Sequence, residues 1–369
     1  MPFDDLFDEA ARQLNVCNAC RYCTGYSPVW PALELRRELT KGDITHLANL
    51  CHDCRDCFTA CMYTEPHVFA LNPPKVFAEV REVTYDQYMW PQEVPAWLRG
   101  RSGLMIGSLL VLGVLLLLVA VTNGLGALTM AGQGSPYDVI SHVVLIAAAG
   151  LPALWAVGVT LRAMVLYWRD THGPLRDLAN PRAWALTLSQ VARLSHQTGG
   201  AEGCSYEKNE PSGARRIHHQ LVLFGFLLTF LSTVSAGFME NFLGDLPPYG
   251  YVSVPVLAGT IGGIMTIVGC VGLLRLKPLA DASQTTATTR RADIALIWAL
   301  IALNVTGLAV LALRTTSLFG PVLVVHLLTV LLAFAIAPYT KFVHWVYRML
   351  AMVNDNLERS RPVPSSNHP

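Results

Sequence analysis

"SGLMIGSLLVLGVLLLLVAVTNGLGALTMAGQGSPY", residues 102–137, contains no charged side chain and decides the class of this chain. A transmembrane helix needs about 20 mostly apolar residues, and residues 103–122 supply them. Five later stretches meet the same requirement, so we predict six transmembrane helices. The predicted spans are 103–122, 139–161, 217–239, 252–274, 294–313 and 318–340.

The composition of the 369 residues agrees with a membrane protein. Hydrophobic residues make up 52% and charged residues 14%, whereas a soluble domain carries about 25% charged residues. The net charge of +1 excludes nucleic acid as a partner, because phosphate binding needs a basic surplus. The opening "MPFDDLFDEAARQLN" is acidic and lacks an apolar core, so we expect no secretory signal and a cytoplasmic N-terminal part.

The distribution of Lys and Arg predicts the orientation, because cytoplasmic loops carry the excess of both. Only Arg314 lies on the opposite side, so both termini are predicted to be cytoplasmic. The residues on the predicted inner side are Arg99, Arg101, Arg169, Arg176, Arg182, Arg193, Lys208, Arg215, Arg216, Lys277, Arg290, Arg291, Arg348, Arg359 and Arg361.

The chain is predicted to be all-α, with a small helical ferredoxin-like domain in front of a six-helix transmembrane bundle. We place the soluble domain at 1–80, a juxtamembrane linker at 81–101, the transmembrane domain at 102–350 and a disordered tail at 351–369. The last span is expected to continue as a helix to about residue 350, with a kink at Pro338.

Four linker aromatics, Tyr85, Tyr88, Trp90 and Trp97, have two interpretations. They form an aromatic belt at the bilayer surface, or they make a contact within the soluble part.

Seven of the nine cysteines form two runs, Cys17-x2-Cys20-x2-Cys23 and Cys51-x2-Cys54-x2-Cys57-x3-Cys61. The second spacing is typical of [4Fe–4S] ferredoxins, in which the fourth thiolate of each cluster comes from the other run. Zinc sites use paired C-x2-C units rather than triplets. The sequence therefore predicts one cluster on Cys17, Cys20, Cys23 and Cys61, and a second on Cys51, Cys54 and Cys57.

The second cluster would take its fourth ligand three residues beyond Cys23, where the chain has Ser27. Either Ser27 binds iron through oxygen, or that corner is open and the cluster is labile or [3Fe–4S]. The two remaining cysteines, Cys204 and Cys270, are interpreted as residues that bind no metal.

Histidines within the apolar segments are candidate axial ligands of b-type haem, because ionisable residues in the membrane are costly and usually functional. His326 and His344 are 18 residues apart, about five turns of a continuous helix. His142 is predicted to lie level with His326, and His218 level with His344. His219 is the alternative to His218, and His172 is a weaker substitute at the inner site. One or two haems are therefore expected.

The motifs "CNACRYCTGY" and "LANLCHDCRDCFTACMYTEPHVFALNPP" closely resemble the tricarballylate-utilisation B or citrate-utilisation B family. "GCSYEKNEPSGARRIHHQLVLFGFLLTFLSTV" resembles the same family, so the likeness covers nearly the whole chain. The ending "PYTKFVH", with His326 before it, is similar to the last helix of the gamma subunit of respiratory nitrate reductase. Ser27 departs from the family pattern, which carries cysteine there.

The resemblance implies an electron-transfer protein of the bacterial inner membrane. It would reoxidise the FAD of a partner tricarballylate dehydrogenase and pass electrons through iron–sulfur clusters and haem to quinone. No G-x-G-x-x-G motif follows a strand pattern, so the flavin is expected on the partner. Two other hypotheses remain open, a haem-free polyferredoxin maturation factor and a transporter or sensor with an iron–sulfur regulatory domain.

Overall fold

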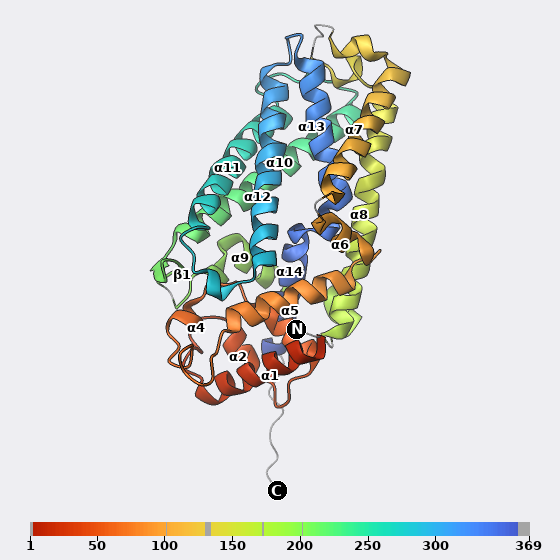
Figure 1. Cartoon of the computed structure of the whole chain (residues 1–369). Helices are drawn as coiled ribbons and strands as arrows, with labels where there is room; N and C mark the ends of the chain where they lie inside the picture. The colour runs from red at the N-terminus through yellow and green to blue at the C-terminus, as the bar shows by residue number, and fades with distance from the viewer. Residues whose placement is uncertain (1–2, 101, 130–133, 172, 201, 361–369) are drawn as a thin grey trace.

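The computed structural model describes residues 3–100, 102–129, 134–171, 173–200 and 202–360. It has two layers, with the cysteine-containing domain at one end and a bundle of long helices at the other (Figure 1). The prediction of an all-α chain is confirmed, with one small addition. Strands β1 (Cys204–Glu207) and β2 (Glu210–Ser212) form an antiparallel hairpin.

Within the part of the chain that the structure describes, six helices are long and apolar enough to cross a membrane, as many as predicted. In the described residues, α7, α8 and α13 pack together, and α13, α12, α11 and α10 follow as successive neighbours. Glycines let α10 and α11 approach closely, as small residues do between membrane helices. A Cβ at Gly262 would lie 2.7 Å from the carbonyl oxygen of Gly225. The six helices are α7 (Gly103–Thr122), α8 (His142–Asp170), α10 (Ala214–Leu243), α11 (Val254–Leu276), α12 (Ala287–Ala312) and α13 (Phe319–Ile336).

The N-terminal domain packs short helices around one apolar core. Thr40 and Asp43 form a capping box that starts α3, and Asn72 accepts from the Lys75 N–H at the start of α5. The α5 helix continues through the boundary predicted at residue 80, so the domain extends into the predicted linker. Its helices are α1 (Phe3–Cys20), α2 (Val29–Glu34), α3 (Lys41–Leu50), α4 (Asp56–Thr59) and α5 (Pro73–Tyr88); α6 (Glu93–Arg99) follows.

The linker aromatics divide between the two interpretations. Tyr85 stacks on Tyr347 with ring centroids 4.4 Å apart, and Tyr88 is buried against Tyr167. These two rings therefore make internal contacts and do not face lipid. Trp90 and Trp97 stay about half exposed.

The expectation of one helix from 318 to about 350 is wrong. After α13 the chain makes two short 3-10 turns, Ala337–Tyr339 and Lys341–Val343, and α14 (His344–Ser360) then starts in a new direction (Figure 1). Pro338 lacks the N–H that a continuing helix needs, and Thr340 is extended and accepts from the Phe342 N–H. The helix therefore ends at the point where only a kink was expected.

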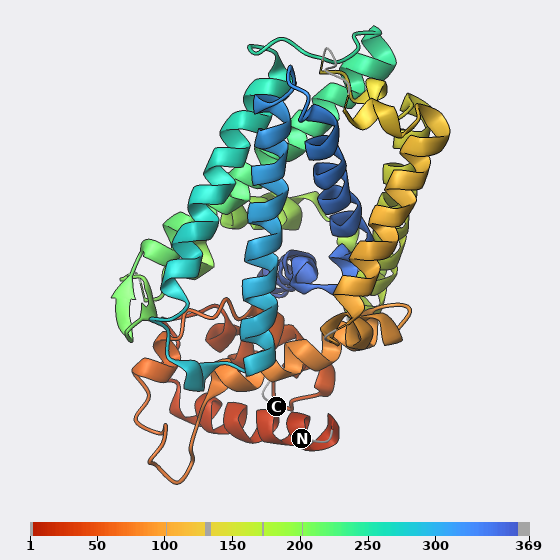
Figure 2. The same ribbon diagram turned by 45° about the horizontal axis from the view of Figure 1, so that its top comes forward.

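The tail predicted from residue 351 is also wrong over 351–360, which belong to α14. This helix is amphipathic and packs against α9 (Pro181–Arg193), α3 and α8. Ala351 and Met352 enter the core of the cysteine domain. The α14 helix, blue in Figure 2, thus lies between the two layers and joins them. The predicted tail residues 361–369 lie outside the described residues.

The remaining short segments are 3-10 turns that connect these helices. They are Leu125–Leu128, Pro136–Asp138, Leu175–Ala179, Ser195–Gln197 and Ala282–Gln284.

Candidate functional site

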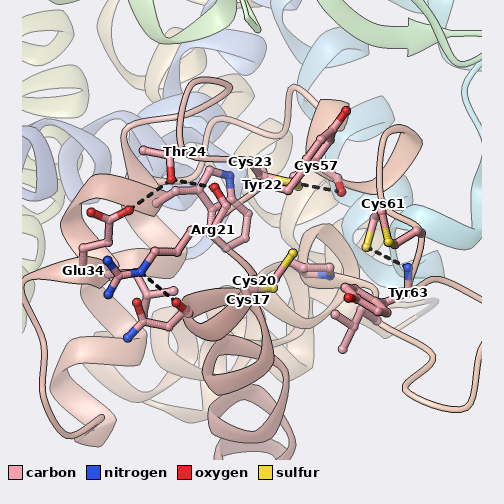
Figure 3. Close-up of a pocket in the computed structure, with 16 residues that line it drawn as sticks. Cys17, Cys20, Arg21, Tyr22, Cys23, Thr24, Glu34, Cys57, Cys61 and Tyr63 are labelled. Carbon is pink, nitrogen blue, oxygen red and sulfur yellow. Dashed lines mark hydrogen bonds between the residues drawn. The ribbon is translucent and has the colours of Figure 1, made fainter.

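The first cysteine run lies at the C-terminal end of α1, beside a surface pocket (Figure 3). Cys17 and Cys20 occupy the last turn of the helix, and Arg21 then takes a left-handed conformation with φ 56°. That turn brings Cys23 to the same pocket, and Cys61 reaches it from beyond α4. The structure therefore brings together the four thiols predicted for the first cluster. Cys20 is exposed, so this set lies at the surface.

The electrostatics of this set fit a polynuclear iron centre. Burial, followed by the neighbouring thiols Cys23, Cys61 and Cys20, raises the pKa of Cys17 to about 12. Burial and the nearby Cys61 and Cys20 also raise the pKa of Cys23 to about 12. Thiolates this close repel one another, so all four ionise together only when a cationic centre binds them. The Tyr63 N–H donates to Cys61 Sγ at 3.3 Å, as expected of a backbone donor to a cluster ligand.

The second run is buried deeper in the domain. Cys51 ends α3, Cys54 lies in the following loop and Cys57 lies in α4, and all three are buried. Asp53 and Arg55 have positive φ values of 57° and 72°, which fold the loop tightly. Burial, with Cys54 and Cys51 next, raises the pKa of Cys57 well above its ordinary value, and Cys23 and Cys17 add to this effect. The two cysteine sets are therefore neighbours.

Ser27 makes a local turn before α2. Its Oγ accepts from the Val29 N–H at 3.4 Å, a turn of the kind that serine side chains form. Cys204, by contrast, is fully buried in β1 and belongs to a small apolar cluster with Cys54, Tyr206 and Leu276. Next to Cys204, the Ser205 N–H donates to Asp56 Oδ1 at 2.7 Å. The β-hairpin is thus attached to the second cysteine run.

Two arginines lie beside the second run, of which Arg55 is buried and Arg215 is partly exposed. Arg215 Nη1 donates to the carbonyl oxygens of His52 and Asp53 at 3.0 and 2.6 Å. Arg55 donates to the Asp281 carbonyl at 3.0 Å, and both guanidinium groups lie over the Tyr206 ring. These bonds dock the cysteine domain onto the start of α10 and onto the segment that follows α11. They also place positive charge beside the thiols, and such charge stabilises a reduced, more negative cluster.

One pair of the predicted histidines lies together at the end of the bundle that faces the cysteine domain. The rings of His219 and His344 have centroids 6.5 Å apart and planes at 84°. His344 Nδ1 is 2.6 Å from the Lys341 carbonyl oxygen, which leaves its Nε2 for a metal, as is common for ligating histidines. The buried Nδ1 of His219 has no hydrogen-bond partner among the described residues. Burial lowers the pKa of His344 to about 3, so this imidazole is neutral, as iron ligation requires.

The preference for His218 over His219 does not agree with this arrangement. A Cβ at Gly272 of α11 would overlap the His218 ring, so that ring packs into the α10–α11 contact. Neighbouring residues on a helix point about 100° apart, and once α14 has turned away from α13, His219 faces His344.

The outer pair, His142 and His326, is not brought together by any contact in the described part of the chain. His142 Nε2 lies 2.8 Å from Glu240 Oε1, and the Tyr137 hydroxyl contacts the same carboxylate. His326 Nδ1 lies 3.0 Å from Thr306 Oγ1 on α12. Each outer histidine thus has a partner of another kind. His172, the weaker substitute, lies outside the described residues.

Among the described residues, no group of three or more His, Cys, Asp or Glu side chains is arranged for a single metal ion. A [4Fe–4S] cluster binds each thiolate to a different iron, so its ligands lie farther apart than those around one ion. What fits an iron–sulfur cluster here is the donor set, seven thiols in two adjacent groups.

Sequence reasoning missed the groups that orient His344. Asp293 of α12 binds Lys341 Nζ at 2.7 Å and also contacts Lys277. The Lys341 carbonyl in turn is the oxygen close to His344 Nδ1. The available signal was an isolated aspartate, Asp293, at the inner end of an apolar helix.

The comparisons with known proteins agree with this arrangement. The family model described as citrate utilization protein B matches residues 98–365, and that of the citrate utilization protein B Fer4-like domain matches residues 10–87. The protein named citrate utilization protein B from Escherichia coli is 36% identical over 357 residues, which cover 96% of this chain and 93% of that relative. No solved structure matches the chain.

Proposed function

The chain belongs to the citrate utilization protein B family, and from that premise we propose that it oxidises a partner flavoprotein at the membrane. The family and its Fer4-like domain indicate an iron–sulfur electron-transfer role in a multi-pass membrane protein. The proposal adds an FAD-dependent dehydrogenase of the tricarballylate type as electron donor, b-type haem as a carrier and membrane quinone as acceptor.

The observation that carries the proposal is the succession of candidate redox ligands from the surface to the bundle. Cys20 of the first set is exposed and Cys57 of the second set is buried. Arg215 binds the loop of the second set, and His219 follows four residues later in the same helix. That spacing is about 6 Å along the helix axis. Electron transfer needs carriers at short separations, and this order supports one path.

The surface position of the first set suits contact with a soluble donor. Tyr22 and Met62 line the same pocket, with 61% and 66% of their surfaces exposed. Exposed aromatic and methionine side chains are common at protein interfaces. Arg55 and Arg215 lie beside the second set, and Asp53 pairs with both of them. Two guanidinium groups against one carboxylate leave a positive charge there, which would favour electron flow inward because it raises the reduction potential of a nearby cluster.

The pair of inner histidines fits one haem. A metal–imidazole bond is about 2 Å, and a ring nitrogen lies about 1 Å from its ring centroid, so two rings on one iron have centroids about 6 Å apart. The separation of 6.5 Å between His219 and His344 agrees with that value. A bound haem would supply a one-electron carrier at this depth. His219 and His344 would hold its iron, and the Lys341 carbonyl would orient the His344 ring.

The orientation in the membrane is also part of the proposal. The cysteine domain and the ends of α1 and α14 lie on one side of the bundle (Figure 1), the side that carries most of the Lys and Arg. We therefore place both termini and the iron–sulfur domain in the cytoplasm of a bacterium, with the helices in its inner membrane.

The test uses the full-length protein purified anaerobically in detergent. Iron, inorganic sulfide and protohaem are quantified, and the protein is then mixed with tricarballylate dehydrogenase and its substrate. We expect reduction of the haem absorption bands that depends on substrate, followed by reoxidation when a short-chain quinone is added. The same mixture without tricarballylate is the control, and a second mixture contains citrate.

Other outcomes favour the competing functions. Clusters without haem would favour the maturation factor. Both cofactors without any reduction by the dehydrogenase would favour the transporter or sensor. A protein with neither sulfide nor haem would overturn the electron-transfer role.

A further inference from the structure

The second predicted cluster has three thiols, Cys51, Cys54 and Cys57, and the serine expected to complete its ligands makes a hydrogen bond elsewhere. Ser27 Oγ accepts from the Val29 N–H in the turn before α2. In the described residues, no hydrogen bond joins the Ser27 hydroxyl to Cys51, Cys54 or Cys57. A buried cluster with three thiolates therefore needs its fourth ligand from another part of the fold.

Cys204 lies beside this run although it is far away in sequence. Its side chain is fully buried and belongs to the same small buried cluster as Cys54. The hairpin that carries it is attached to the run by the bond between the Ser205 N–H and Asp56 at 2.7 Å. Cys270, the other cysteine outside the runs, is buried within α11 and shares no buried cluster with the run.

The surroundings of Cys204 suit a thiolate ligand. Arg215 Nη1 lies 4.0 Å from Cys204 Sγ and also binds the loop carbonyls of His52 and Asp53. One guanidinium group thus contacts both the ligand loop and the candidate fourth thiol. Burial disfavours an ionised thiol here, and the positive charge of Arg215 offsets part of that cost.

We propose that Cys204 is the fourth cysteine ligand of the second iron–sulfur cluster, together with Cys51, Cys54 and Cys57. This inference rests on the proposed function for the presence of that cluster. The Sγ–H now donates to the Gln197 carbonyl at 3.3 Å. On binding, the Sγ proton leaves to solvent and an Sγ–Fe bond forms, with no change in the number of electrons.

With this ligand, the cluster would link the two layers of the fold through bonds to iron. Cys51, Cys54 and Cys57 belong to the N-terminal domain, whereas Cys204 lies in the segment between α9 and α10. Iron bound by both would fix the inner end of α10, which carries His219, against the cysteine domain.

The test compares variants of the full-length protein purified anaerobically. Cys204→Ala should lower iron and sulfide by about half, the share of one cluster of two, or produce an oxidised [3Fe–4S] signal in electron paramagnetic resonance. Cys270→Ala removes a buried thiol that has no such role and should leave both contents unchanged. Ser27→Ala should also leave them unchanged.

A second substitution separates ligation from packing. Cys204→Asp keeps an anionic ligand, so it should retain more second-cluster iron than Cys204→Ala. If Cys204 only packs, the order reverses, because a buried carboxylate costs more than a small cavity. That reversed order, or a Cys204→Ala protein with the iron, sulfide and spectrum of the unaltered chain, overturns the inference.

Measurement of the unaltered protein keeps this inference distinct from the proposed function. Two clusters without haem would weaken the quinone route and leave the Cys204 test intact. One cluster only, with normal haem, would overturn the Cys204 inference while electron transfer stands.

Discussion

Replacement of His219 by alanine should remove the haem, whereas the same replacement of its neighbour His218 should not. The two residues are adjacent in α10 and equally placed along the membrane normal to within about 1.5 Å. Only His219 faces His344, with ring centroids 6.5 Å apart. His218 packs against Gly272.

The size of the effect follows from the ligand count. One histidine pair in the described residues has the separation that an iron held by two imidazoles would need, so His219→Ala would remove one of the two protein ligands. Loss of a group that merely supports a ligand lowers metal affinity by about 10- to 100-fold, or about 1.4–2.7 kcal/mol. Loss of the ligand itself should exceed this, so bound haem should fall from roughly one per chain to near zero.

The assay is the pyridine haemochrome content per protein, measured on both variants after purification in detergent. Iron and sulfide are measured on the same samples, because normal cluster content shows that the cysteine domain has folded. His218→Ala should retain haem even if the cavity beside Gly272 lowers stability.

Two results would refute this reasoning. Haem loss in His218→Ala with retention in His219→Ala would reverse the ligand assignment. Retention of half the haem in His219→Ala would show a second haem, the outer one that His142 and His326 were predicted to bind.

Three further predictions concern the surroundings of these sites. Asp293→Asn should lower haem affinity by about 10-fold, since Asp293 holds Lys341, whose carbonyl orients His344; a haem titration measures this, and an unchanged affinity would contradict it. Burial lowers the pKa of His46 to about 3, so the unfolded chain binds the extra proton and stability should fall as pH drops from 6.5 towards 3, by about 1.4 kcal/mol per pH unit. Denaturant titrations at several pH values should show that the free energy of unfolding depends less steeply on pH in His46→Leu. An equal dependence on pH in both proteins would refute the assignment. Met352→Ala should destabilise the cysteine domain by about 2–5 kcal/mol, because Met352 is 3% exposed in its core; a stability equal to that of the unaltered chain would argue against the docking of α14.

Local features made the membrane part predictable. Each span is a long apolar run, and a helix is the structure that satisfies its own backbone in lipid, so the six spans could be read from residues 102–340. The end of the last span could not be predicted in this way. Whether Pro338 bends a helix or ends it depends on which elements the following residues pack against. Here the amphipathic α14 packs against α3, α8 and α9.

The candidate ligands divide in the same way. The spacing within each cysteine run identified the thiols of the first set, which the fold does bring to one pocket. The pairing of histidines relied on one continuous helix from His326 to His344, and the end of α13 before Pro338 removed that premise. Cys204 was set aside because it stands alone in a polar loop, and only the docked hairpin brings it to Cys54.

The sequence by itself determined the membrane class, the number of spans and the seven thiols, because hydropathy and ligand spacing act over a few helical turns. Tertiary structure alone decided that His219 rather than His218 faces His344, that α14 joins the two layers and that a hairpin thiol lies beside the second run. These are contacts between residues up to about 300 positions apart, and they depend on packing angles and chain reversals that no local pattern encodes.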